Sequence, residues 1–234
     1  MTPERLAKFE RVLDRRQTDL TLIADQVNKS QNLSALIRTA DAVGMLEVHA
    51  VVPEEGYRDF NRTAKGSGQW LEVRSHENFQ QAADAVRGKG MTIVAAHFSG
   101  SAVDYRELDY TQPIALLLGA EKRGVSQHGA DQADQHILVP MMGMVSSLNV
   151  SVAAGIILAE AQRQRTQAGL YDKSRLDPEL RRDILFRWCH RRLADYCHLH
   201  QLQYPPVDEA LNLVEPSAWY EAVRGERAAK RTFA

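Results

Sequence analysis

The stretch from Ile137 to Arg165, ILVPMMGMVSSLNVSVAAGIILAEAQRQR, constrains the fold more than any other part of the chain. Its first three residues are apolar and are followed by Pro140, which is typical of a buried strand that ends at a proline. A turn rich in Gly, Met, Ser and Asn follows, and small or branched apolar residues then run into the polar EAQRQR. This order predicts a strand, a polar loop and a helix, an arrangement that places ligands at the carboxyl end of a strand.

The predicted helix carries apolar residues on nearly every side of its first turns. We therefore expect it to be buried between layers. Ser147 and Asn149 stand in the polar loop immediately before it. Helix capping and a site role use the same residue types at such positions, and the sequence leaves both open.

Strands and helices alternate through the rest of the body. Apolar runs predict strands at 19–27, 47–52, 71–73, 91–97 and 114–118, and helical patterns occur at 3–16, 33–43, 79–86 and 127–133. This alternation predicts an α/β fold with a mostly parallel sheet covered by helices. The polar, glycine-bearing residues 54–69 predict a loop or a ragged helix.

After Arg165 the strand signals stop, and helical patterns at 178–199 and 219–231 flank the irregular QYPPVDEA. The predicted division is a basic helix at 1–19, a central domain at 20–165 and a helical extension at 166–234. No apolar run reaches 18 residues and the first 16 residues lack the apolar core of a signal peptide, so we expect a cytoplasmic protein.

The 29 basic and 30 acidic side chains give a net charge of −1, but the basic ones are unevenly placed. Five arginines lie within residues 181–192, against the single acid Asp183. Such a cluster is either a solvated helix face or a phosphate-binding surface. A polyanion would therefore meet the terminal segments rather than the body.

Cys189 and Cys197 are each followed by a histidine, and His200 lies just beyond them. A metal site is one interpretation of this pattern. Packing in an amphipathic helix is the simpler one, because no CxxC pair is present, and we expect no metal.

Two further loops at predicted strand ends carry polar residues. In the first, Asn32 is a candidate N-cap or site residue, and Arg38 stands among apolar neighbours, where it either extends to solvent or meets an anion. In the second, GAEKRG follows a buried strand and is not a GxxxxGK[ST] phosphate loop. Glu121 within it could pair with Arg38 or accept a hydrogen bond from a ligand hydroxyl.

Together the three blocks resemble a known set. NxxxxxRTA at 32–40, LLLGAEKRGV at 116–125 and the stretch at 137–165 are similar to the three motifs of the SPOUT (SpoU–TrmD) RNA methyltransferases, in the same order. The basic start LAKFERVLDRR and the helical extension resemble the branch that methylates the 2′-hydroxyl of guanosine-18 in tRNA. The resemblance spans roughly residues 20–165 and is less specific in the tail.

The resemblance implies a deep trefoil knot in the C-terminal part of the sheet domain, although chains generally avoid knots. It implies S-adenosylmethionine as methyl donor, tRNA as partner, and a homodimer, with neither DNA nor a membrane as partner. The implied cofactor-binding residues are Ala96, Gly119, Val139 and Leu148. The implied catalytic residues are Asn32, Arg38, Glu121, Ser147 and Asn149. The expected RNA contacts are Arg11, Arg15, Arg16, Arg181, Arg182, Arg191 and Arg192.

Three alternatives remain at this point. The same chemistry could act on ribosomal RNA, although only about 20 residues precede the first predicted strand and leave little room for an N-terminal RNA-binding domain. A non-catalytic RNA-binding protein could use the same fold. A metabolic α/β enzyme with a nucleotide cofactor is a third interpretation, but the sequence lacks a phosphate-cradling signature.

Overall fold

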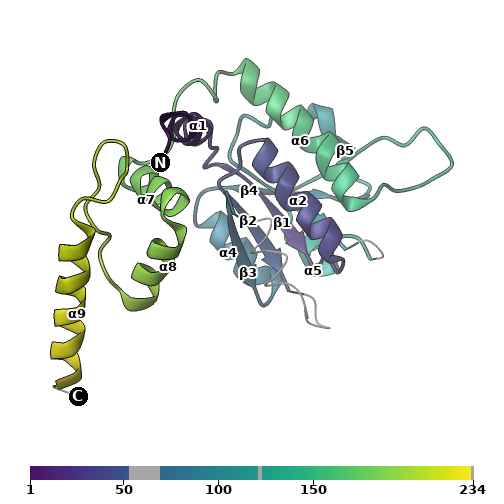
Figure 1. Ribbon diagram of the computed structural model, residues 1–234. Coiled ribbons are helices and arrows are strands. Elements are labelled where there is room, and N and C mark those ends of the chain that lie inside the picture. The colour runs from purple at the N-terminus through teal and green to yellow at the C-terminus, as the bar shows by residue number, and fades with distance from the viewer. Residues whose placement is uncertain (53–68, 121–122, 233–234) are drawn as a thin grey trace. The chain divides into compact units, whose positions relative to one another are not determined.

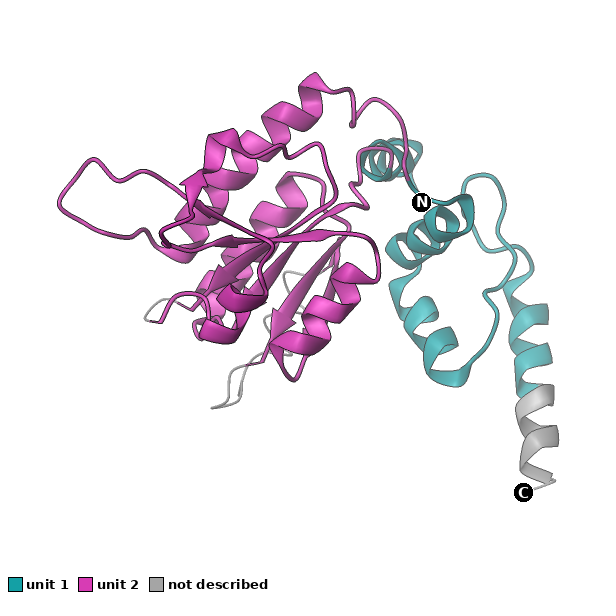
Figure 2. Ribbon diagram, turned by 180° about the vertical axis from the view of Figure 1, so that it is seen from behind, with its two compact units in different colours: residues 1–13, 176–234 teal, residues 14–175 magenta. Residues whose placement is uncertain are grey.

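The computed structural model describes residues 1–52, 69–120 and 123–232. They form two compact units, shown in different colours in Figure 2: residues 1–13 with 176–234, called unit 1, and residues 14–175, called unit 2. No helix in the described ranges is long and apolar enough to cross a membrane.

Unit 2 is built on a parallel sheet, which in the described residues has seven strands in the order β3-β2-β1-β6-β4-β7-β5. Every pairing between these strands is parallel, as the alternating pattern predicts. The strands are β1 (Leu20–Asp25), β2 (Glu47–Val51), β3 (Glu72–His76), β4 (Thr92–Ala96), β5 (Val103–Asp104), β6 (Ile114–Gly119) and β7 (Gln135–Leu138). The two-residue strand β5 has no counterpart in the sequence prediction, because it is too short to show a period.

Helices cover both faces of the sheet (Figure 1). The pair α2 (Ser30–Ala42) and α6 (Val150–Gln167) packs on one face, and α4 (Phe79–Arg87) and α5 (Gln127–Gln132) pack on the other. A short 3₁₀ helix, η1, spans Tyr105–Glu107. Each face of the sheet has its own hydrophobic core, because successive side chains of a strand point to opposite faces. On β1, Leu22 and Ala24 belong to the core under α2 and α6, and Ile23 belongs to the core under α4 and α5.

The helix α6 differs from its prediction. Its buried residues repeat at helical spacing on one face, including Ala154, Ile157, Leu158 and Ala161. Val152 on the other side is 50% exposed. The expectation that α6 is buried between layers is therefore wrong for the single chain, because the helix packs on the sheet and on α2 while the side that carries Val152 is exposed.

Two buried arginines hold together the edge of the sheet where the strands begin. The Arg16 guanidinium donates to the carbonyls of Met45 and Trp70, which precede β2 and β3, at 2.7 and 2.8 Å. Arg165, near the end of α6, donates to five oxygens between residues 17 and 112, including Asp19 Oδ1 at 2.7 Å. Both side chains are fully buried, and they donate their hydrogen bonds to carbonyl and carboxylate oxygens of the protein in place of water.

Unit 1 is helical, with α1 (Pro3–Leu13), α7 (Pro178–Cys189), α8 (Arg191–His200) and α9 (Pro216–Thr232). The single helical stretch predicted at 178–199 is two helices, because the backbone leaves the helical conformation at His190 (φ −130°, ψ 47°). Phe9 of α1 packs edge-to-face on Trp188 of α7, with ring centroids 5.5 Å apart. Thus the two ends of the chain share one small core.

Candidate functional site

Three of the four predicted cofactor residues lie at the ends of neighbouring strands. Gly119 ends β6, Ala96 ends β4, and Val139 directly follows β7. These three strands are neighbours in the sheet, so the three residues lie side by side. The register agrees, with Ala96 opposite Ile137 on β7 and Asp25 opposite Gly119 on β1. Gly119, Ala96 and Val139 therefore lie at the carboxyl edge of the sheet, where open α/β sheets bind ligands.

Only glycine fits at position 119, because the backbone of Gly124 and Val125 lies directly against it. A Cβ added there would lie 1.9 Å from the carbonyl carbon of Gly124 and 2.0 Å from the nitrogen of Val125. The loop closes through a hydrogen bond from the Gly124 amide to the Ala120 carbonyl at 2.8 Å. Backbone groups, and not side chains, therefore dominate this end of β6.

The fully buried Asp25 at the end of β1 anchors the same loop from the neighbouring strand. Its Oδ2 accepts a hydrogen bond from the Ser126 amide at 2.9 Å, while Oδ1 has no partner in the described part of the chain. Asp25 is not among the residues predicted from the sequence. An acid closing the apolar run LTLIAD was the available signal, because buried carboxylates require partners.

Asn149 is the N-cap of α6, one of the two roles that the sequence left open, and it also binds Asn32. Its Oδ1 caps α6 by accepting from the Ser151 amide at 2.9 Å, and its Nδ2 donates to Asn32 Oδ1 at 3.3 Å. Asn32 itself is no N-cap, because α2 begins earlier, at Ser30, with Lys29 at the cap position. Asn32 is instead buried in the first turn of α2 and linked to the start of α6.

The remaining predicted catalytic residues are exposed or undescribed. Arg38 extends from α2 into solvent and makes no hydrogen bond or ion pair with the described residues. Glu121 lies outside the described residues, so its pairing with Arg38 stays a prediction. Ser147 is exposed and Leu148 half-buried in the loop that leads from β7 to α6, which extends away from the sheet in Figure 1.

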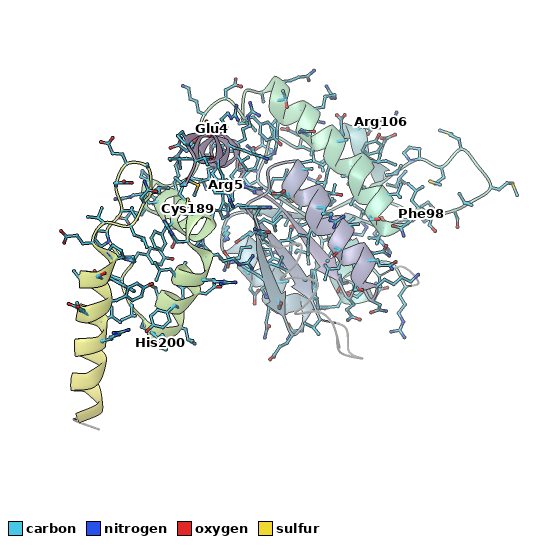
Figure 3. The ribbon with its side chains drawn as sticks, viewed as in Figure 1. Glu4, Arg5, Phe98, Arg106, Cys189 and His200 are labelled. Carbon is cyan, nitrogen blue, oxygen red and sulfur yellow. The ribbon has the colours of Figure 1, made fainter. Side chains whose placement is uncertain are left out.

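The tip of that loop is apolar and open. Met142 and Met144 are 93% and 102% exposed, and Val145 is 63% exposed. Phe98, which follows β4 and is labelled in Figure 3, is 85% exposed. Exposed apolar side chains of this size are typical of surfaces that bind another molecule.

The arginines expected to contact RNA divide into two groups. Arg11, Arg15, Arg182, Arg191 and Arg192 are exposed, and Arg181 is half-buried. The prediction that Arg16 contacts RNA is wrong. Its guanidinium is fully buried and binds Asp41 Oδ1 at 2.7 Å and two backbone carbonyls. Arg16 therefore stabilises the fold and is not placed to meet a phosphate.

The cysteines and histidines of unit 1 have ordinary packing roles in the structure. Burial raises the pKa values of the Cys189 and Cys197 thiols. His190 Nε2 lies 2.6 Å from the Leu211 carbonyl, and Cys197 donates to the Gln203 carbonyl. Within the described ranges no three His, Cys, Asp or Glu side chains are grouped so that they could hold a metal ion.

Comparison with known proteins gives consistent matches over nearly the whole chain. The model of the SpoU rRNA Methylase family matches residues 19–159, and that of its C-terminal segment, "SpoU, rRNA methylase, C-terminal", matches residues 163–214. The tRNA (guanosine(18)-2′-O)-methyltransferase of Thermus thermophilus is 50% identical over 81% of this chain and 98% of its own length. The Escherichia coli protein of the same name is 44% identical over 96% of this chain and 99% of its own.

Solved structures agree with these matches. The crystal structure of the Aquifex aeolicus TrmH/SpoU tRNA modifying enzyme superposes with a TM-score of 0.73 at 40% identity, over 81% of this chain and 97% of that one. The SpoU methyltransferase AviRb from Streptomyces viridochromogenes, in complex with the cofactor AdoMet, superposes with a TM-score of 0.57 at 28% identity, over 67% of this chain and 61% of that one.

Proposed function

The chain belongs to the SpoU rRNA methylase family, and on this premise we propose that it methylates the ribose 2′-hydroxyl of guanosine-18 in tRNA, with S-adenosylmethionine as donor. The observation that carries the proposal is the near full-length similarity, at 44% and 50% identity, to two enzymes named for this reaction. The first match covers 96% of this chain and the second 81%.

The strand ends of unit 2 suit the cofactor. Ala96 and Gly119 are small, so backbone amides and carbonyls at the ends of β4 and β6 are not covered by their side chains. Val139 is half-buried directly after β7, and Leu148 is half-buried in the loop before α6. We propose that these four residues hold the cofactor, mainly through backbone groups. When bound, it supplies an electrophilic methyl group on a sulfonium.

The proposed catalytic residues are Arg38, Asn32, Glu121, Ser147 and Asn149. A 2′-hydroxyl is a poor nucleophile near neutral pH, so its proton must be accepted as the new bond forms. A guanidinium, with a pKa above about 12, is a weak base by itself. We propose that a substrate phosphate and Glu121 position Arg38 so that it orients the hydroxyl and relays the proton.

Asn32 and Asn149 act in this proposal by positioning. Their hydrogen bond joins the first turn of α2 to the start of α6, so it fixes the helix that carries Arg38 relative to the loop that carries Ser147. Accurate placement of the hydroxyl against the methyl carbon can contribute several kcal/mol to the rate.

Three further features belong to the proposal. Family membership supports a deep trefoil knot in the C-terminal part of the sheet domain. It also supports a homodimer, for which the outer side of α6, with Val152 half-exposed, is a suitable surface. The substrate supports a cytoplasmic location, with the exposed arginines of unit 1 and Arg15 as the RNA contacts and no role for DNA or a membrane.

A methyl-transfer assay tests the function. Purified protein is incubated with labelled S-adenosylmethionine and an unmodified tRNA transcript, and the methylated ribose is mapped. We expect label on the ribose of guanosine-18. Label in ribosomal RNA instead of tRNA would overturn the substrate, and binding of the methyl donor without transfer to any RNA would favour a non-catalytic protein.

A further inference from the structure

A pocket of about 590 Å³ lies at the carboxyl edge of the sheet, on the side of β1, β2 and β3. It is lined by residues that follow these strands or begin α4 and α5: Gln26, Val52, Asn78, Phe79, Ser126 and His128. The proposed cofactor residues lie at the ends of other strands, β4, β6 and β7. A volume of this size accommodates a ligand as large as a nucleoside.

The wall of this pocket offers hydrogen bonds and an aromatic surface. Gln26 and Asn78 contribute amides, and Ser126 contributes a hydroxyl. The His128 imidazole stands edge-to-face on the Phe79 ring, with centroids 5.7 Å apart and planes at 89°. The Gln26 amide and the His128 ring nitrogens make no hydrogen bond with the described residues, so they are available to a ligand.

The described wall of the pocket offers no cation for an anionic ligand. No Lys or Arg is among the described residues that line the pocket, and the carboxylate of Glu77 also borders it. A phosphate group would meet repulsion there without a compensating cation. Amides beside an aromatic ring instead match the edge and face of an unstacked base, which proteins bind in single-stranded RNA.

The backbone supplies a second, independent observation. Gln26 has φ of 52°, in the left-handed region that a glutamine rarely adopts. Residues held in such conformations gather at functional sites, where the surrounding structure compensates for the strain. A glycine would fit this position without strain, so the sequence retains a side chain at a conformational cost.

We propose that this pocket binds an unstacked base of the RNA substrate, belonging to a nucleotide other than the one that is methylated. The inference rests on the proposed function for the nature of the substrate. In the sheet order β2 is three strands from β4, on the order of 14 Å at the usual strand spacing. A single RNA strand laid along the carboxyl edge could therefore reach both places.

The substitution Asn78→Asp tests the amide. Asn78 Oδ1 caps α4 by accepting from the Gln81 amide at 3.0 Å, and an aspartate caps equally well but loses the Nδ2 donor. We expect KM for an unmodified tRNA transcript to rise roughly five-fold, as for the loss of one hydrogen bond, with kcat within about two-fold of wild type.

A matched control separates this loss from added charge. Gln81→Glu makes the same amide-to-carboxylate change in the same helical turn, and keeps the acceptor for the Glu77 amide, now 3.0 Å from Gln81 Oε1. Gln81 does not line the pocket. We expect its KM to stay within about two-fold of wild type. An equal rise in both variants would mean that charge alone is responsible, and would overturn the proposal.

Gln26→Gly sharpens the test, because a structural role and a binding role predict opposite results. Relief of the left-handed strain should leave the melting temperature unchanged or higher. Loss of the amide should nevertheless raise KM for tRNA by roughly five-fold. A stable Gln26→Gly variant with wild-type KM would overturn the proposal.

Two more outcomes distinguish this inference from others. If the variants bind S-adenosylmethionine more weakly but keep the wild-type KM for tRNA, the pocket binds the adenine of the methyl donor. That result would overturn the proposal that it binds a base of the RNA. If the wild-type protein methylates no RNA, the proposed function fails. Fluorescence anisotropy with labelled tRNA transcript then still tests the pocket, since equal affinities of wild type and Asn78→Asp would overturn it and weaker binding by the variant would support it.

Discussion

The two edges of the sheet are built on opposite principles. Where the strands begin, Arg16 and Arg165 are fully buried and bind the backbone carbonyls and acids around them. Where the strands end, the Gln26 amide and the His128 ring nitrogens make no hydrogen bond with the described residues. The first edge uses its charges on the protein itself, and the second leaves polar groups for a ligand. The proposed cofactor and base-binding residues thus lie at the edge opposite the two arginine clamps.

The largest effect is expected from Arg165→Leu at the edge where the strands begin. The substitution leaves oxygens of Gln17, Asp19, Tyr110 and Gln112 without their donor. Breaking a buried ionic network in this way costs about 3–5 kcal/mol of unfolding free energy. Urea denaturation measures it. Arg163→Leu is the control, because Arg163 lies on the same helix with an exposed ion pair to Glu160, and should lose less than about 1 kcal/mol.

Arg38→Ala removes a proposed catalytic side chain and should show the reverse pattern, a loss of activity without a loss of stability. We expect single-turnover methyl transfer to fall by about 100-fold or more, as when a positioned transition-state group is removed. Since Arg38 is exposed and makes no polar contact with the described residues, the unfolding free energy should change by less than about 0.5 kcal/mol. Near-normal transfer in this variant would remove Arg38 from the mechanism, whereas near-normal transfer in Arg38→Lys would mean that a positive charge is enough.

Acid should weaken the edge where the strands begin. Burial alone would raise the pKa of the Glu47 carboxyl at the start of β2, but contacts with His49 and Lys89 hold that pKa at about 2, below its ordinary 4.5. The pKa of Asp19 is lowered as well, because bonds to Arg165 and Arg175 outweigh its burial.

A depressed folded-state pKa contributes stability that is complete above the unfolded pKa and is lost as pH falls through the folded one. The Glu47 contribution should therefore be lost between about pH 4.5 and pH 2. Urea midpoints at pH 6, 4 and 3 measure the slope, and Glu47→Gln should flatten it. An unchanged slope in that variant would mean that other carboxylates carry the dependence.

The smallest effect is expected at Asn149, where capping and positioning can be separated. Asn149→Ala loses the cap of α6 and should cost about 1 kcal/mol of stability. Asn149→Asp keeps the acceptor for the Ser151 amide but cannot donate to Asn32. We expect it to restore stability and not methyl transfer. Full activity in Asn149→Asp would show that the residue is only a cap.

Comparison of sequence and structure shows where local pattern suffices. Apolar runs located the longer strands because burial on both faces leaves a continuous signal, as in β1 and β6. Helix boundaries shifted by a few residues, as at α2, where Ser30 and not Leu33 begins the helix. The break at His190 and the two-residue strand β5 were missed because neither has enough residues to show a period.

The candidate site was predicted as three separate loops, and the sequence indicated correctly that each follows a strand. Which loops are neighbours depends on strand order. Only the order β6-β4-β7 places Gly119, Ala96 and Val139 side by side. The Asn32–Asn149 bond likewise joins residues 117 positions apart, which no local pattern can indicate.

By itself, therefore, the sequence determined the elements, the parallel α/β class and the three polar loops, because periodicity and turn chemistry are local properties of the chain. Tertiary structure alone decided that Arg16 is a buried clamp and not an RNA contact, and that Arg165 binds partners 53 to 148 residues away. A charged side chain has the same appearance in the sequence whether it meets solvent or a buried oxygen. Its environment is set by packing, and packing depends on contacts between distant segments.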